Sequence, residues 1–204
     1  MILIAIAGGS CSGKTTLAGL IEELALERGL SCAVIPLDNY YKRSDLPFEE
    51  RMKINHDLPE AFDWPLCHDH LTRLAAGQPI EMPLYDYTIH NRTDKTVRID
   101  PPRVTLMEGL YTLHDESIRS ICDLKIFLDC PIEERRRRRL ARDISERGRT
   151  REFTEFMFDN VAEPAFINLV KPTNRWADIV ACDAQLVVND IASLFENAGA
   201  SARD

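Results

Sequence analysis

The sequence contains no apolar run close to the roughly 20 residues that a membrane span requires. Its N-terminal apolar stretch, residues 2–7, ends in two glycines, and no positively charged segment precedes it as a signal peptide would need. The six cysteines form no C-x-x-C pair that would indicate a disulfide or zinc framework. We therefore expect a cytoplasmic chain with free thiols and no membrane partner.

Basic residues are also fewer than acidic residues. The chain has 25 Lys and Arg against 33 Asp and Glu, for a formal net charge of −8. A protein that binds nucleic acid usually presents a basic face, so we expect no nucleic-acid partner. A nucleotide-dependent nucleic-acid-binding protein stays open as an alternative of another class, since a local basic patch can override the total charge. The sequence also leaves a homo-oligomer open.

Strand and helix patterns alternate along the chain, which indicates an α/β fold with a mostly parallel central sheet in three layers. The 204 residues suit a single domain, 1–204. Predicted strands cover residues 2–7, 31–37, 103–107 and 124–128, with a weaker last strand at Val180 or at 186–188. Predicted helices cover 14–28 and 65–76, the second capped by Asp63. A β excursion is expected at 79–102 and a frayed tail at 198–204.

The first strand runs into a glycine-rich loop that fits G-x-x-x-x-G-K-[ST]. Backbone N–H groups of such a loop, with the N-terminus of the following helix, wrap a phosphate, and this is the P-loop of nucleotide-binding proteins. Lys14 is expected to reach the β and γ phosphates and Thr15 to ligate Mg²⁺. We predict that ATP or GTP is bound by Gly8, Gly9, Ser10, Cys11, Ser12, Gly13, Lys14, Thr15 and Thr16.

Two carboxylates follow strands that end beside this loop. Asp38 ends the second predicted strand and Glu108 ends the 103–107 strand, both at the carboxyl edge of the sheet where such folds bind ligands. They suit a Mg²⁺ shell, completed by Thr15, and a base that takes the proton of an acceptor hydroxyl. The strings N-K-x-D and D-x-x-G, expected in a GTPase switch, are absent. The sequence therefore favours a kinase.

A run of arginines, residues 135–139, is followed by Arg142, Arg147 and Arg149. On a helix, Arg135, Arg139 and Arg142 share one face, and Gly148 then breaks the pattern as in a hinged lid, which we place at 142–153. Arginines that a closing lid brings in stabilise the charge of phosphoryl transfer. Arg136 and Arg137 are expected to be solvated or paired with Glu133 and Glu134.

Together these motifs resemble the uridine kinase family. The ordered set also includes N-H-D-L-P-E-A-F-D at 55–63, similar to that family's N-F-D-H-P-D-A-F-D. Likewise L-Y-D-Y at 84–87, with His90 and Arg92, looks like its Y-D-F…H-S-R hairpin. Further matches are P-A-F at 164–166, P-T at 172–173 and A-D at 177–178, so the resemblance spans roughly residues 2–191.

The resemblance implies roles for individual residues. It implies that Asp38 is the base that faces a nucleoside 5′-hydroxyl and that Arg142 and Arg147 contact the triphosphate. The acceptor nucleoside would be bound by Asp57 at the ribose, by Tyr85 and His90 at the pyrimidine, and by Arg139 and Arg149.

Three positions depart from the family pattern. His56 and Leu58 stand where the family often has Phe and His, and Met157 stands where it commonly presents a glutamine to the ribose. We predict ATP-dependent phosphorylation of a nucleoside, uridine first and cytidine second. The alternative within the same class is a P-loop kinase for another sugar or a vitamin-like alcohol. The departures favour this alternative, and the Tyr85–His90 hairpin opposes it.

Overall fold

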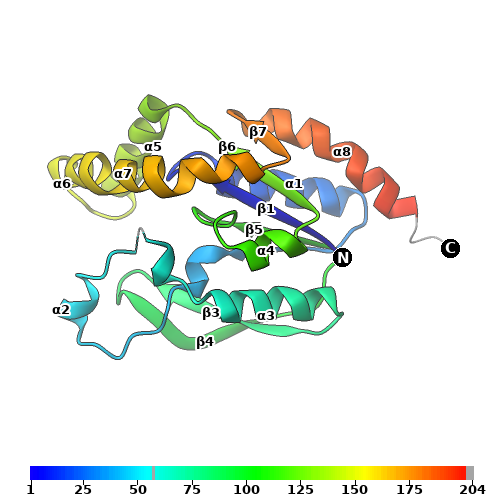
Figure 1. Cartoon of the computed structure of the whole chain (residues 1–204), viewed down its shortest axis with the longest axis horizontal. Coiled ribbons are helices and arrows are strands. Elements are labelled where there is room, and N and C mark those ends of the chain that lie inside the picture. The colour runs from blue at the N-terminus through cyan, green and yellow to red at the C-terminus, as the bar shows by residue number, and fades with distance from the viewer. Residues whose placement is uncertain (57, 201–204) are drawn as a thin grey trace.

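The computed structural model describes residues 1–56 and 58–200. Its central sheet has five strands in the order β2-β5-β1-β6-β7, and every neighbouring pair is parallel (Figure 1). The strands are β1 (Ile2–Gly8), β2 (Cys32–Pro36), β5 (Val104–Glu108), β6 (Leu124–Leu128) and β7 (Ile179–Ala181). The predicted α/β fold with a parallel sheet is confirmed.

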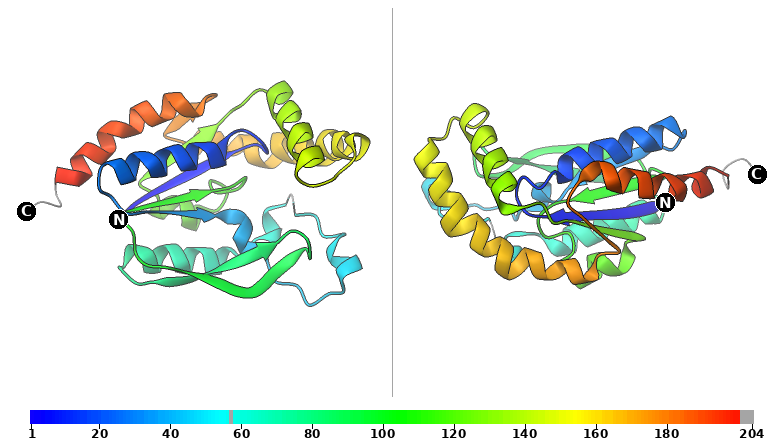
Figure 2. Two further views of the ribbon diagram at one scale, coloured as in Figure 1. Left: turned by 180° about the vertical axis from the view of Figure 1, so that it is seen from behind. Right: turned by 90° about the horizontal axis from the view of Figure 1, so that it is seen from above.

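Alternate side chains of β1 enter two separate cores, which explains why this strand is apolar throughout. Ile4 and Ile6 pack with α1 (Lys14–Glu27) and α8 (Ala184–Ala200), which lie side by side on one face of the sheet (Figure 2). Leu3, Ala5 and Ala7 point to the other face, into a second core. A strand with helices on both faces must bury side chains in both directions.

The second core is covered by α3 (Trp64–Ala75), α4 (Glu116–Ile121) and the segment Phe166–Val170. Asp63 caps α3 as predicted, because its side chain accepts from the backbone N–H of Leu66. The remaining elements are α2 (Phe48–Arg51), α5 (Ile132–Ser145), α6 (Arg151–Met157), α7 (Glu163–Ala165), three 3₁₀ segments (Leu37–Tyr40, Pro59–Ala61, Lys171–Trp176) and two π-helical segments (Phe158–Ala162, Phe166–Val170).

A two-stranded antiparallel hairpin, β3 (Ile80–Asp86) and β4 (Asn91–Ile99), lies outside the parallel sheet (Figure 1). It carries Tyr85 on β3, and His90 stands in the turn. In Figure 1 the turn lies on the same side of the molecule as α5 and α6, so the hairpin and these helices face one another across the end of the sheet.

The C-terminal part of the chain corrects one prediction. Val180 lies in β7, but residues 186–188 belong to α8 and form no strand. The reason is periodicity over a longer window, since Val187, Ile191 and Phe195 recur at every fourth position and are all buried. The helix continues to Ala200, and the rest of the expected tail, 201–204, lies outside the described residues. None of the described helices is long and apolar enough to cross a membrane.

Candidate active site

A cavity of about 1050 Å³ opens at the carboxyl edge of the parallel sheet. Three strands deliver its central groups, because β1 leads into the phosphate loop, β2 into Asp38 and β5 into Glu108. Parallel strands end at one edge, so residues far apart in the sequence meet there. The hairpin forms one side of the cavity, and α5, α6 and the turn between them form another.

Backbone conformation in the phosphate loop depends on glycine at two positions. Gly8 and Gly13 have φ of 147° and 102°, values that residues with side chains rarely adopt. A Cβ on Gly8 would also lie 2.6 Å from the carbonyl oxygen of Leu128 on β6. Cys11, in the same loop, also has a positive φ, of 60°, which is uncommon for a residue other than glycine.

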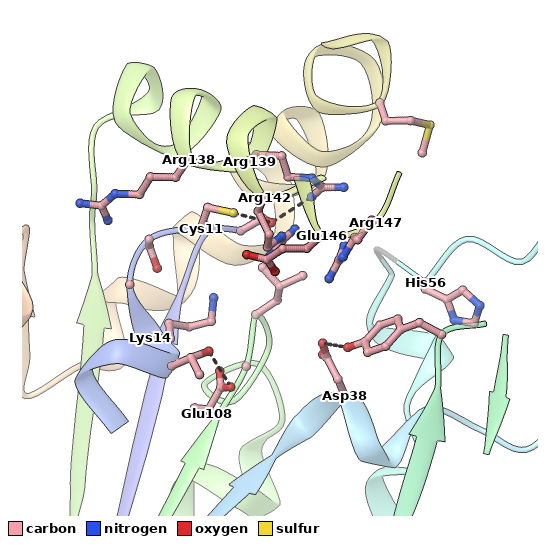
Figure 3. Close-up of a pocket in the computed structure, with 18 of the residues that line it drawn as sticks. Cys11, Lys14, Asp38, His56, Glu108, Arg138, Arg139, Arg142, Glu146 and Arg147 are labelled. Atoms are coloured by element: carbon pink, nitrogen blue, oxygen red, sulfur yellow. Dashed lines mark hydrogen bonds between the residues drawn. The ribbon is translucent and has the colours of Figure 1, made fainter. Parts of the chain in front are cut away.

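Lys14, the first residue of α1, projects into the cavity from a buried position (Figure 3). Its ammonium donates to the carbonyl oxygen of Gly9 over 2.9 Å. Burial lowers the pKa of Lys14, while the nearby carboxylates of Glu108 and Asp38 act in the opposite direction. Its amino group is thus held beside the loop that would wrap a phosphate.

Glu108 and Thr15 place two hard oxygen atoms next to this lysine. The Thr15 hydroxyl donates to Glu108 Oε1 over 3.1 Å (Figure 3). Burial raises the pKa of Glu108, and Lys14 partly offsets that effect. Within the described ranges no group of three or more His, Cys, Asp or Glu side chains could hold a metal ion. The donor set fits Mg²⁺, which keeps waters and substrate phosphates in its shell and needs only one or two carboxylates.

Asp38 lies on the 3₁₀ segment that follows β2, across the cavity from the phosphate loop (Figure 3). Its Oδ2 accepts a hydrogen bond of 2.6 Å from the hydroxyl of Tyr87. Gly109 lets the ends of β2 and β5 approach here, since a Cβ on Gly109 would lie 2.5 Å from the Cβ of Leu37. No local sequence pattern predicts the Tyr87 contact, which depends on how the hairpin docks.

Aromatic and imidazole rings form the wall beyond Asp38. The Tyr85 hydroxyl lies 3.3 Å from His56 Nε2, and the Tyr41 ring lies within 5 Å of both rings. Burial, with a contribution from Asp38, raises the pKa of Tyr85 to about 12. His90 faces His56 with 6.1 Å between ring centroids. These residues all line the cavity, whereas Asp57, predicted at the ribose, lies outside the described residues.

Four predicted arginines converge on one carboxylate that the sequence-based reasoning did not single out. The side chain of Asp143 is fully buried, and its oxygens lie 2.9–3.4 Å from guanidinium nitrogens of Arg139, Arg142, Arg147 and Arg149. Burial by itself would raise the pKa of Asp143, but the arginines hold it below its usual value. The spacing was a usable signal, because Asp143 is four residues from both Arg139 and Arg147.

All four guanidinium groups also line the cavity, and Arg139 reaches the phosphate loop. Its Nη1 donates to Ser10 Oγ over 2.9 Å (Figure 3). The cluster joins four cations to a single carboxylate and so keeps a positive excess on the phosphate side of the cavity. Such an arrangement can bind a polyanion and stabilise charge on transferred oxygens.

Arg135 does not belong to this cluster, although it shares a helical face with Arg139. It forms a buried bidentate ion pair with Glu163, at 2.8 and 3.0 Å, and lies over the ring of Phe166. Arg137 pairs with Glu134 as expected, but Arg136 pairs with Asp159 and Glu155 rather than with its helical neighbours. Packing of α5 against the segment 155–166 redirects these side chains, and no local pattern predicts it.

Replacing Asp143 by asparagine is expected to lower the free energy of unfolding by about 3 kcal/mol at neutral pH, since it leaves four buried or half-buried cations without their anion. The folded pKa lies below the ordinary value of about 3.9, so the wild-type stabilisation is present above that pH and is lost as the pH falls through the lowered pKa. Urea denaturation at pH 7 and pH 3 measures both effects. Glu134→Gln, which removes a half-buried carboxylate from the more exposed Arg137 and Arg138, is the matched control and is expected to change stability far less. Equal losses in the two variants would contradict the role given to Asp143.

Three further residues that line the cavity lie on or near α5, α6 and α8. Met157, at the end of α6, lines the cavity, as do Glu146 of the turn after α5 and Cys182 near the start of α8. Met157 was predicted at this cavity from the sequence, whereas Glu146 and Cys182 were not. Glu146 follows the helix that carries the arginine cluster and places a carboxylate near Arg142 and Arg147 (Figure 3).

Comparison with known proteins gives consistent matches over most of the chain. Residues 3–190 match the model of the phosphoribulokinase/uridine kinase family. The uridine kinases of Anoxybacillus flavithermus and of a Geobacillus species are 43% and 44% identical to this chain over 180 residues, which is 88% of this chain and 84% of each relative. Phosphoribulokinase from Rhodobacter spheroides superimposes with a TM-score of 0.64 at 17% identity, over 88% of this chain and 68% of that structure. At that identity the structural likeness concerns the fold alone.

Proposed function

Because this chain belongs to the phosphoribulokinase/uridine kinase family, we propose that it transfers the γ-phosphoryl group of ATP to the 5′-hydroxyl of uridine, with cytidine as a second acceptor. One observation carries the proposal. A single cavity contains the phosphate loop, the Asp38 carboxylate and, beyond Asp38, a wall of aromatic and imidazole rings. The same order is found in the two substrates, where the γ-phosphate of ATP is followed by the 5′-hydroxyl of the nucleoside and then by its pyrimidine ring.

Each group in the cavity has a task in this reaction. The phosphate loop and Lys14 would hold the β and γ phosphates, and Arg142 and Arg147 would stabilise charge on the transferred oxygens. The oxygens of Thr15 and Glu108 would hold Mg²⁺. That ion, when bound with the nucleotide, neutralises phosphate charge. Asp38 would accept the proton of the 5′-hydroxyl as its oxygen attacks phosphorus.

The hairpin side supplies recognition of the nucleoside. Tyr85 and His90 can contact the faces and edges of a pyrimidine, because a phenol and an imidazole offer both ring surfaces and hydrogen-bonding atoms. Arg139 and Arg149 would serve the acceptor side, and Asp57 the ribose. The names of the relatives favour uridine over another sugar or vitamin-like alcohol. Several arginines of α5 pair with Asp143, Glu163 and Asp159, which argues against a basic face on α5 for nucleic acid.

A screen of acceptors tests the proposed function. The protein would be incubated with ATP, Mg²⁺ and single nucleosides or small alcohols, and product would be measured directly. We expect uridine to have the highest kcat/KM, followed by cytidine. A non-nucleoside alcohol with a higher kcat/KM than uridine would overturn the assignment of the acceptor and leave the kinase class in place.

Met157 allows a sharper test of the ribose contact. A thioether is only a weak acceptor, so a sugar hydroxyl that faces it lacks a good hydrogen-bond partner. Met157→Gln supplies an amide that can donate and accept, and we expect it to lower the KM for uridine by about 2- to 10-fold, since a net hydrogen bond contributes about 0.5–1.5 kcal/mol. Steady-state kinetics with uridine and cytidine measures the change.

The neighbouring residue provides the control for this substitution. Phe156 lies on the same helix but is 60% exposed and does not line the cavity, so Phe156→Gln is expected to leave the KM for uridine unchanged. If Met157→Gln changes the KM no more than Phe156→Gln does, Met157 has no contact with the sugar.

A further inference from the structure

Tyr87 lies at the end of the hairpin, in the turn that follows β3, and its side chain enters the cavity between the two substrate sides. Its hydroxyl donates to Asp38 Oδ2 at 2.6 Å, a short distance that indicates a charge-assisted hydrogen bond (Figure 3). Partial desolvation of the phenol in the cavity raises the pKa of Tyr87 well above its ordinary value, and Asp38 adds to this effect. The phenol therefore stays protonated and remains a donor to the carboxylate.

The ring of Tyr87 has a second contact, with the turn that carries the lid arginines. The guanidinium carbon of Arg147 lies 5.4 Å from the centre of the Tyr87 ring, within the range of a cation–π interaction. Arg147 is itself paired with Asp143, at 3.4 Å. The Tyr87 ring also packs edge to face with Tyr85, with 5.2 Å between centroids. The side chain of Tyr87 thus contacts Asp38, Tyr85 on the hairpin and Arg147 on the opposite wall of the cavity.

We propose that Tyr87 is a positioning residue for phosphoryl transfer, whose hydroxyl orients the Asp38 carboxylate and whose ring supports Arg147 on the opposite wall. The proposal rests on the proposed function in giving Asp38 the role of base. A carboxylate has two oxygens, and holding Oδ2 directs Oδ1 toward an acceptor hydroxyl. A base fixed by such a bond loses less freedom on reaching the reactive geometry.

Phenylalanine in place of Tyr87 would keep a ring that can contact an arginine but would have no hydroxyl to bond a carboxylate. The two parts of the proposal, hydroxyl and ring, can therefore be separated by substitution. Tyr87 is 51% exposed, so neither change is expected to prevent folding.

Tyr87→Phe tests the hydroxyl. We expect kcat to fall by about 10-fold or more, with the KM for ATP and for the acceptor changed less than about 3-fold, because the lost bond orients the base without touching either substrate. The rate is measured on the best acceptor of the screen, so the comparison holds whichever alcohol that is. An unchanged or raised kcat, or an effect confined to the acceptor KM, would overturn the role of the hydroxyl.

The matched control is Tyr40→Phe, which removes a hydroxyl from the same 3₁₀ segment as Asp38. Tyr40 is fully buried, its hydroxyl lies 3.0 Å from His70 Nδ1, and neither residue lines the cavity. We expect this variant to lose stability and to keep the wild-type kcat. A fall in kcat equal to that of Tyr87→Phe would show that loss of any hydroxyl near Asp38 acts through the fold, and would overturn the proposal.

Tyr87→Leu tests the ring by a measurement that needs no acceptor. Arg147 lies in an exposed turn, and we expect trypsin to cleave there at least about 3-fold faster in Tyr87→Leu than in wild type or Tyr87→Phe, since only leucine removes the cation–π contact. Equal cleavage rates in all three proteins would overturn the role of the ring. A wild-type protein that phosphorylates no nucleoside would sink the proposed function, yet the difference in cleavage would remain.

Discussion

Replacing Lys14 by alanine is expected to lower phosphotransfer by about 10³-fold or more with every acceptor. The transferred phosphoryl group carries charge throughout the reaction, and groups of the phosphate loop that are aimed at it contribute most of the stabilisation. The ammonium of Lys14 is held in place by the Gly9 carbonyl and faces the cavity beside Glu108. Its burial means that water cannot replace the lost charge at low cost.

Two further variants separate this effect from a disturbed fold. Lys14→Met keeps the aliphatic stem that packs in the loop and is expected to be as inactive as the alanine variant. Lys171→Ala removes an exposed lysine whose nearest acidic partner, Asp129, is 3.9 Å away, and is expected to retain full activity. Initial rates with ATP and uridine measure all three. Activity of Lys14→Ala within a few-fold of wild type would remove the phosphate loop from the mechanism.

Asp38→Asn is expected to lower kcat by about 10²- to 10⁴-fold while leaving nucleotide binding close to wild type, the range that follows loss of a positioned base. The amide retains the size of the carboxylate but cannot take the proton of the 5′-hydroxyl. Asp38 lies across the cavity from the phosphate loop, so the change should not reach the triphosphate directly. Titration with nucleotide, beside steady-state kinetics, measures the two quantities separately.

A carboxylate of the hairpin supplies the control for Asp38. Asp94 is 86% exposed and pairs with Arg43 on the surface, so Asp94→Asn is expected to change neither kcat nor nucleotide affinity. If Asp38→Asn lost its affinity for nucleotide and kept its turnover, Asp38 would be a metal ligand or a structural residue. The role of base would then pass to another residue.

The phosphate loop was predictable because its chemistry is local. Gly8 and Gly13 take backbone angles that the motif requires, and the strand before them and the helix after them are equally local patterns. Asp38 and Glu108 were predictable for a different reason. Parallel strands of one sheet end at the same edge, and Asp38 lies two residues after β2 while Glu108 closes β5. The topology of the sheet therefore brings together residues that are far apart in the sequence.

What the sequence did not predict depends on packing between distant segments. Arg135 was grouped with the lid arginines because helical spacing is all that the sequence displays, yet Glu163, 28 residues away, draws it into the interior. The bond from Tyr87 to Asp38 joins residues 49 apart, and it exists only because the hairpin folds back over the end of β2. Asp143 is the exception, since its spacing from the arginines was visible in the sequence.

The most direct test of the central claim is to identify the product formed from ATP, Mg²⁺ and uridine. With ATP labelled in its γ-phosphate, we expect the label to appear in uridine 5′-monophosphate, in proportion to the ADP released, and phosphorus NMR to show a phosphate ester on the 5′ oxygen. Release of ADP without labelled nucleotide product, or transfer of the label to a different alcohol in preference to uridine, would contradict it.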